Sequence, residues 1–272
     1  MTDRTVFYED PLADDFAGTH IDTVEIGADF PFLPQGILYN ALGTLLYYVI
    51  AIPLVFLMAR FTLGLRTKNR KALGQVRGQA FYLYGNHTQA LDAVLPALAA
   101  WPQRAYVIAH RDAVSIRGLR TIVQMLGAIP VPSEIGGMRS FSQALEERAK
   151  EGACIGIFPE AHIWPWYTGV RPFASGSFRY PARSLRPVVA MAATYRKRRG
   201  LFAWRKKPAM TLWFSEPIYP NPALSPRQRQ EDLRNQVYDF MKEVTSRPGN
   251  VSYIQYLPKE AENTREADPQ KN

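Results

Sequence analysis

Hydrophobic residues after residue 78 alternate between short continuous runs and longer amphipathic stretches. The short runs are rich in β-branched and aromatic residues and predict strands at 79–84, 104–110, 127–131, 153–158, 187–195 and 209–214. Two longer stretches, 140–152 and 225–244, repeat apolar residues at helical spacing, and the second opens on a Ser-Pro helix start. This β-α-β-α-β order predicts an α/β fold.

A long uncharged segment precedes these strands. No charged residue occurs from Phe30 to Ala59, and the segment exceeds the roughly 20 apolar residues that a membrane-crossing helix needs. Pro53 interrupts the segment, so a bent helix, two short helices in the membrane interface and a buried core helix remain as alternatives. We expect residues 30–70, which include a basic flank, to associate with the membrane.

The two sides of the uncharged segment differ in charge. Residues 1–29 hold eight acidic side chains and one arginine, whereas the residues from Arg60 to Arg77 include six basic side chains and no acidic one. Because basic flanks stay on the cytoplasmic side, we expect the globular part to face the cytoplasm. The acidic start also differs from the positively charged start of a cleaved signal peptide.

The overall composition limits the classes of partner. Lys and Arg total 33 against 24 Asp and Glu, a net charge of +9, which favours anionic surroundings such as lipid head groups, phosphorylated substrates or nucleic acid. Given the membrane segment, the basic and aromatic stretch 195–207 fits anionic lipid better than nucleic acid. The single cysteine, Cys154, lies in an apolar run, and no Cys/His metal spacing or GxxxxGK[ST] loop occurs. We expect no metal, cofactor or nucleic-acid partner.

A histidine and an aspartate follow the first predicted strand of the domain. The sequence YGNHTQALDAV, residues 84–94, places His87 directly after a Gly-Asn turn and Asp92 in the first turns of a helix. With His87 in the loop, the carboxylate can fix the imidazole tautomer and leave the other ring nitrogen as a general base. The alternative is that His87 caps the turn and Asp92 is a favourable anion near a helix N-terminus.

Four more segments follow NHTQALD in order: LGAIPVPSE (126–134), IGIFPEAHIWPW (155–166), RPFASGSFRYPARS (171–184) and RPVVAMA (186–192). Together the five segments resemble the glycerophospholipid acyltransferase family, which includes 1-acyl-glycerol-3-phosphate acyltransferases, over residues 79–215. The resemblance implies an α/β fold with a mixed sheet flanked by helices, located at the membrane. It also implies that His87, supported by Asp92, deprotonates an acceptor hydroxyl that attacks the thioester of acyl-CoA or acyl-carrier protein.

The resemblance assigns substrate-binding residues as well. Phe158, Pro159 and Glu160 match the family's F-P-E-G block and are expected to line the substrate pocket. Two arginines that the family is thought to use for the acceptor's phosphate are absent here, from the PSE and EAHI segments. The nearest replacements in sequence are Arg139, Arg171 and Arg179, each of which could instead be a surface arginine. We choose Arg171, because it directly precedes PFASGSF, the segment expected to return the chain to the pocket.

These observations predict four regions: an acidic arm (1–29), a membrane-associated segment with its basic flank (30–70), an acyltransferase domain (71–256) and a disordered tail (257–272). The predicted activity is transfer of a fatty acyl group to a hydroxyl of a lysophospholipid, such as lysophosphatidic acid, in phospholipid synthesis on the cytoplasmic side. A different lipid acceptor is the main alternative. A lipid hydrolase, for which the chain lacks a G-x-S-x-G elbow, and a non-catalytic lipid-binding protein are further alternatives.

Overall fold

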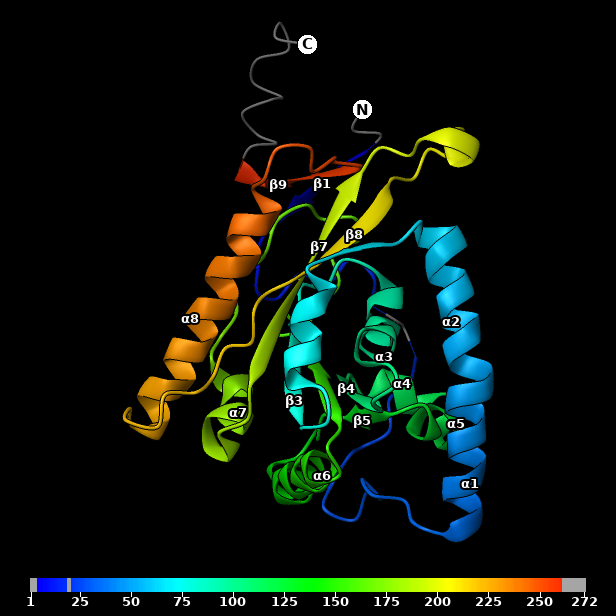
Figure 1. Ribbon diagram of the computed structural model, residues 1–272, viewed down its shortest axis with the longest axis vertical. Coiled ribbons are helices and arrows are strands. Elements are labelled where there is room, and N and C mark those ends of the chain that lie inside the picture. The colour runs from blue at the N-terminus through cyan, green and yellow to red at the C-terminus, as the bar shows by residue number, and fades with distance from the viewer. Residues whose placement is uncertain (1–3, 19–20, 261–272) are drawn as a thin grey trace, which may run out of the picture.

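The computed structural model describes residues 4–18 and 21–260, and most of them surround a seven-stranded sheet (Figure 1). The strands lie in the order β2-β8-β7-β3-β6-β4-β5. Their bounds are β2 Arg66–Lys68, β3 Phe81–Gly85, β4 Ala105–Ala109, β5 Ala128–Pro130, β6 Cys154–Ile157, β7 Val188–Arg196 and β8 Ala209–Phe214. Only β7 and β8 pair antiparallel, so the sheet is mixed, as predicted. The sheet begins at β2, inside the region 30–70 that the sequence assigned to the membrane segment.

Helices cover both faces of this sheet, which explains why its central strands are apolar throughout. One face is covered by α6 (Met138–Lys150), α7 (Arg179–Ser184) and α8 (Pro226–Thr245), and the other by α3 (Leu95–Ala100). Short helices α4 (Asp112–Ser115) and α5 (Arg120–Met125) lie between β4 and β5 in the chain. Both amphipathic stretches form helices where predicted, and a reciprocal cap between Ser225 and Gln228 starts α8.

Most of the uncharged segment lies in one continuous helix of 27 residues, Ile37–Leu63. By length and composition, this helix is long and apolar enough to cross a membrane. It comprises α1 (Ile37–Leu45), α2 (Ile52–Met58) and π-helical turns at 46–51 and 59–63. The first π-helical turn ends two residues before Pro53, and its wider spacing accommodates a residue that has no N–H to donate. The alternatives of two short helices and of a buried core helix are both wrong, because the segment is unbroken and mostly exposed.

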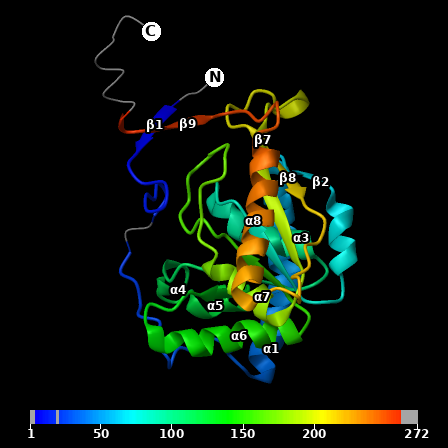
Figure 2. The same ribbon diagram turned by 90° about the vertical axis from the view of Figure 1, so that its left-hand side faces the viewer.

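The acidic arm and the end of the chain meet in a second, two-stranded sheet. β1 (Arg4–Tyr8) pairs in parallel with β9 (Ile254–Pro258), and Figure 2 shows the two strands side by side. The predicted disordered tail begins at residue 257, so the structure corrects its start, while residues 261–272 of that tail lie outside the described residues. Local composition did not reveal β9, because its partner strand lies about 250 residues earlier in the chain.

Candidate active site

A tight turn at the carboxyl end of β3 positions the histidine. A Cβ atom on Gly85 would lie 2.7 Å from Cε1 of Phe158 and 3.0 Å from Cε of Met191, so only glycine fits between these side chains. The amide of Asn86 donates to the carbonyl of Ala193 at 3.2 Å and accepts from the N–H of the same residue at 2.7 Å. This two-way contact clamps the turn onto β7 and fixes the direction in which the chain leaves β3.

His87 and Asp92 come together as the sequence predicted they could. The Nδ1 atom of His87 lies 3.4 Å from Oδ2 of Asp92, and that oxygen also accepts the N–H groups of Thr88 at 2.6 Å and Gln89 at 2.7 Å. Asp92 is the third residue of a 3₁₀ turn, Ala90–Val94, which Gln89 caps. The carboxylate therefore stabilises the start of the turn and also faces the imidazole, so its position is compatible with both interpretations of the sequence.

The imidazole of His87 is held on its face as well as at Nδ1. The ring of Phe158 stacks on it with 4.6 Å between centroids and 24° between planes. Within the part of the chain that the structure describes, only Asp92 contacts a ring nitrogen of His87 by a hydrogen bond, so Nε2 is left for a substrate. The side chain of His87 is 13% exposed, whereas that of Asp92 is buried.

A tyrosine that the sequence analysis did not single out supports the same loop. The hydroxyl of Tyr195, at the end of β7, lies 2.7 Å from Oγ1 of Thr88 and accepts from Nε2 of Gln89 at 3.2 Å. Burial raises the pKa of Tyr195 well above its ordinary value, so the phenol stays protonated as a hydrogen-bond partner. The sequence pattern of a buried strand could not reveal these hydrogen bonds. Most residues of such a strand pack in the core, and the pattern does not show which of them contacts a loop.

The segment after Phe158 folds back over the histidine loop. Main-chain N–H groups of Trp164 and Trp166 donate to the carbonyls of His87 at 3.2 Å and of Thr88 at 2.9 Å. The indole N–H of Trp164 donates to the carbonyl of Asp14 at 2.8 Å, so the acidic arm packs against this segment. The aromatic run in this segment therefore belongs largely to the packing around the site, since both tryptophans are buried.

Glu160 is buried beneath this loop and binds main-chain groups on both sides. Its Oε2 accepts the N–H of His87 at 3.2 Å, and its Oε1 accepts the N–H of Arg171 at 2.9 Å. Burial raises the pKa of Glu160, and the charge of Arg171 together with these N–H donors opposes that rise. In this arrangement Glu160 positions His87 through the backbone and does not present its carboxylate to open space.

Arg171 is also buried, which conflicts with the predicted role as the phosphate-binding residue. Its guanidinium lies 3.4 Å from Oε2 of Glu160, donates to the carbonyls of Glu160 at 3.3 Å and of His162, and stacks over the ring of Trp164. Only 1% of the side chain is exposed. Position in the sequence indicated that Arg171 lies near the site, but not that its side chain is turned inward.

The other two candidate arginines for phosphate binding lie elsewhere in the fold. Arg139 is exposed on α6, and Arg179 begins α7, where its guanidinium donates to the hydroxyl of Tyr180 at 2.7 Å. Neither makes a hydrogen bond or an ion pair with His87 or Glu160 in the described structure. The described residues also contain no cluster of three or more His, Cys, Asp or Glu side chains that could hold a metal ion.

Comparison with known proteins bears on this arrangement directly. The family model described as Acyltransferase matches residues 67–194, which include His87, Asp92 and Glu160. No curated protein matches the chain. Among solved structures, the crystal structure of the 1-acyl-sn-glycerophosphate (LPA) acyltransferase PlsC from Thermotoga maritima matches with a TM-score of 0.49 and 15% sequence identity, over 77% of this chain and 95% of that chain. The family match confirms, for residues 67–194, the resemblance drawn from the ordered motifs: this part of the chain is similar to acyltransferases.

Proposed function

We propose that the protein is a membrane-associated O-acyltransferase that moves a fatty acyl group from acyl-CoA or acyl-carrier protein to a hydroxyl of a lysophospholipid, as a step of phospholipid synthesis. The observation that carries this proposal is the imidazole of His87. It is held at Nδ1 by Asp92 and on one face by Phe158, while Nε2 is left for a substrate. A histidine fixed in this way is a general base for a hydroxyl nucleophile, and no protein nucleophile is required.

The proposed reaction uses this base twice. The acceptor's hydroxyl oxygen attacks the thioester carbonyl carbon while its proton passes to Nε2 of His87. The carboxylate of Asp92 stabilises the imidazolium, because the two groups face each other at 3.4 Å. The C–S bond then breaks, and the departing thiolate takes the proton from Nε2, which leaves the ester product and restores the neutral base.

An apolar groove supports a substrate with an acyl chain. It has a volume of about 760 Å³ and lies between the long helix, α3 and β8. Its apolar lining includes Ile52, Phe56, Leu95, Leu98 and Phe214. Leu95, which lines the groove, begins α3 directly after the turn that contains Asp92. Lys68 and Arg70 line the same groove, are exposed, and carry the positive charge that a phosphate-bearing acceptor requires in place of Arg171.

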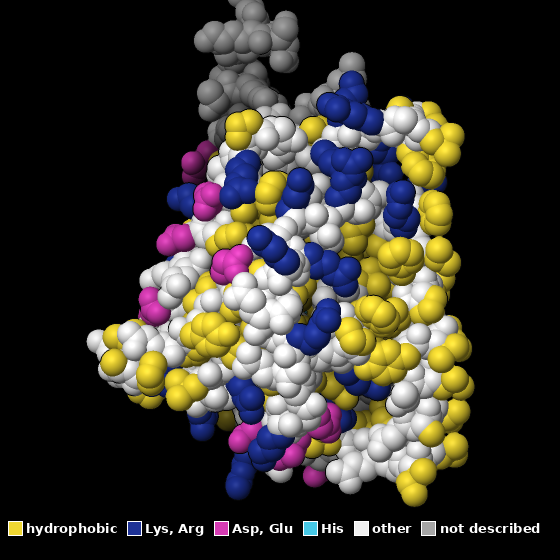
Figure 3. Space-filling view, viewed as in Figure 1, with side chains coloured by type: hydrophobic (Ala, Val, Ile, Leu, Met, Phe, Trp, Pro, Cys, Tyr) yellow, Lys and Arg dark blue, Asp and Glu magenta, His cyan; other side chains and the backbone are white. Residues whose placement is uncertain are grey.

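The long helix supports attachment to one membrane surface. It packs lengthwise on the domain, where Tyr48 donates to the carbonyl of Pro102 at 3.2 Å and Tyr47 accepts the N–H of Ala105 at 3.0 Å. Away from the groove it exposes apolar residues along its whole length (Figure 3): Ile37, Leu38, Leu42, Leu45, Val49, Ile50, Leu54, Leu57 and Phe61. A helix fixed to the domain in this way cannot cross a bilayer without drawing the domain in. We therefore propose that it lies in the cytoplasmic leaflet with its outer side in lipid.

Labelling distinguishes a lying helix from a spanning one. The single native cysteine is buried, so Gln35→Cys and Thr67→Cys provide reporters just outside the two helix ends, where both positions are exposed. A membrane-impermeant maleimide added to the cytoplasmic face should label both variants. If only the Thr67→Cys variant reacted from that side, the helix would span the membrane and this part of the proposal would be wrong.

The activity itself is tested with purified protein, labelled acyl-CoA and a panel of lysolipids. Acylated lipid is the expected product, and the acceptor with the highest kcat/KM identifies the substrate class. Release of free fatty acid without acylated lipid would indicate a hydrolase. Absence of both products, with acyl-carrier protein also tried as donor, would indicate a lipid-binding protein without this activity.

A further inference from the structure

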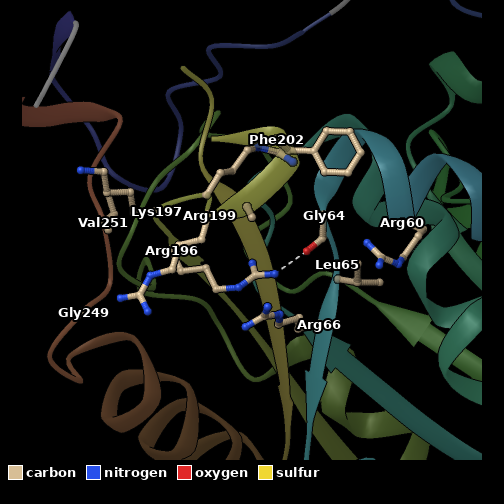
Figure 4. Close-up of a pocket in the computed structure, with 12 residues that line it drawn as sticks. Arg60, Gly64, Leu65, Arg66, Arg196, Lys197, Arg199, Phe202, Gly249 and Val251 are labelled. Carbon is tan, nitrogen blue, oxygen red and sulfur yellow. Dashed lines mark hydrogen bonds between the residues drawn. The ribbon is translucent and has the colours of Figure 1, made fainter. Parts of the chain in front are cut away.

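A strongly basic hollow opens between the end of the long helix and the connection from β7 to β8. Its volume is about 600 Å³, and Figure 4 shows the side chains around it. Six basic residues line it, and we call the space they surround the basic hollow: Arg60, Arg66, Arg196, Lys197, Arg198 and Arg199. No aspartate or glutamate is among the lining residues. Arg60 and Arg66 also line the apolar groove, whereas Arg196, Lys197, Arg198 and Arg199 do not, and the role of His87 does not account for these four charges.

Some of these arginines are fixed by the end of the long helix. Arg196 donates to the carbonyl of Gly64 at 2.6 Å, and Arg198 donates to that of Thr62. From the same β7–β8 connection, Arg205 donates to the carbonyl of Phe61 at 2.7 Å. The last carbonyls of a helix lack intrahelical partners and form the negative end of its dipole, so these guanidinium groups cap the helix. The walls of the hollow are thereby held in place without a ligand.

These contacts use carbonyl groups and leave the formal positive charge uncompensated. In the described structure, no salt bridge involves any of the six basic residues. Burial, and then the charges of Arg66, Arg198 and Arg60, lower the pKa of Arg196 from 12.5 to about 10. Arg196 remains protonated at neutral pH. The smaller part of the lowering, which comes from the neighbouring arginines, is repulsion that a bound anion would relieve.

The surroundings of the hollow indicate where that anion comes from. Leu201 and Trp204, on the β7–β8 connection, are 83% and 75% exposed, and Phe202 lines the hollow itself. The exposed apolar side of the long helix ends at Phe61, which contacts the ring of Phe202. Figure 3 shows basic side chains gathered in the upper part of the molecule, next to the apolar side. Apolar and aromatic groups beside a basic cluster are typical of the level at which lipid phosphates lie.

We propose that the basic hollow binds the phosphate of an anionic phospholipid of the bilayer, and so docks the end of the long helix and the β7–β8 connection on the membrane. Guanidinium groups suit this role because their planar N–H groups donate in pairs to phosphate oxygens. Arg66, Lys197 and Arg199 are exposed, so their side chains can move to contact the lipid phosphate. Hydrogen bonds to the end of the long helix hold Arg196 and Arg198 in place.

The test measures binding to vesicles, which does not depend on acyl transfer. Full-length protein is titrated with vesicles of phosphatidylcholine alone and of phosphatidylcholine with phosphatidylglycerol, up to half-maximal binding. The measured quantity is the ratio of the two partition coefficients, which cancels the apolar contribution of the helix. The variant combines Arg66→Gln, Lys197→Gln and Arg199→Gln. The control combines Arg139→Gln, Arg183→Gln and Arg227→Gln, three exposed arginines on α6, on α7 and in the first turn of α8. Figure 1 shows α6 and α7 at the opposite end of the molecule from the β7–β8 connection.

The variant should lose the preference for anionic vesicles by at least about tenfold, since each basic residue near the surface contributes roughly fivefold. The control should retain most of the preference. Equal loss in both proteins would show a diffuse effect of net charge and would overturn the proposal, as would an unchanged preference in the variant. A variant that binds vesicles normally but has lost affinity for free CoA would assign the hollow to the acyl donor instead. Unchanged melting temperatures show that both proteins are folded.

Discussion

Replacing Arg171 by methionine separates a structural role from the phosphate-binding role that the sequence suggested. The substitution removes a buried guanidinium but keeps much of the side-chain volume. It leaves the carboxylate of Glu160 buried with only two main-chain donors, at 3.2 and 2.9 Å. Breaking a buried ion pair by removing one partner costs about 3–5 kcal/mol. For a chain of this size, that loss should lower the melting temperature by roughly 10 °C.

Two further measurements sharpen this prediction. Glu160→Gln combined with Arg171→Met removes both charges, so the double variant should be more stable than the sum of the single effects predicts. Removing Arg171 also raises the pKa of Glu160 further, because the charge of Arg171 opposes the rise caused by burial. A raised pKa in the folded state means that stability is lost as the pH rises through it. The destabilisation of Arg171→Met should therefore be smaller at pH 5 than at pH 8.

Melting followed by circular dichroism gives the stabilities, and steady-state kinetics gives the effect on transfer. Because Glu160 binds the main chain of His87, we expect kcat to fall without a selective change in the KM of a phosphate-bearing acceptor. An unchanged melting temperature together with a raised KM for that acceptor alone would refute the structural role. Arg171 would then bind the phosphate, as the sequence first indicated.

Three more predictions concern the site and its supports. Asp92→Asn should lower kcat on the order of 10²-fold at near-normal stability, and equal activity of Asp92→Asn and wild type would contradict this. Asp92→Ala should also unfold more easily, because it leaves the buried N–H of Thr88 and the partly buried N–H of Gln89 without their acceptor, at a cost of about 1–3 kcal/mol for the buried group. Gly85→Ala should displace Phe158 from the imidazole and lower turnover at a cost of about 1–3 kcal/mol in stability, and normal kinetics would show that the stacking is dispensable. Burial raises the pKa of the Cys154 thiol, so iodoacetamide should label it only in denaturant, and rapid labelling of native protein would disprove its burial.

The strands and the histidine loop could be predicted because local pattern determines them. Buried strands of a largely parallel sheet are continuously apolar, and β3 to β8 lie where the sequence shows such runs. The contact between His87 and Asp92 followed from placing a turn at Gly85 and Asn86, since the turn lets residues five apart face each other. Both inferences need only the residues near one another in the chain.

The rest depends on contacts between distant segments. Arg171 and Glu160 are adjacent to predicted pocket segments, yet the carbonyls and the ring of Trp164 that surround the guanidinium turn it inward. The pairing of β1 with β9 and the capping of the long helix by the β7–β8 connection involve chain separations that no local pattern encodes. The sequence shows basic residues in two separate stretches, 60–77 and 195–207, but only the fold brings Arg66 and Arg196 to one hollow.

The central claim is that His87 is the base of an acyl-transfer reaction, and its most direct test is the activity of purified His87→Ala with labelled acyl-CoA and a lysophospholipid. Wild-type protein is the control, and the two activities are compared after showing that both proteins have the same membrane partition and the same melting temperature. The account predicts acylated lipid from the wild type and a loss of at least about 10²-fold in the variant, since general base catalysis contributes on that order. Near-normal transfer by a folded His87→Ala protein would contradict the account.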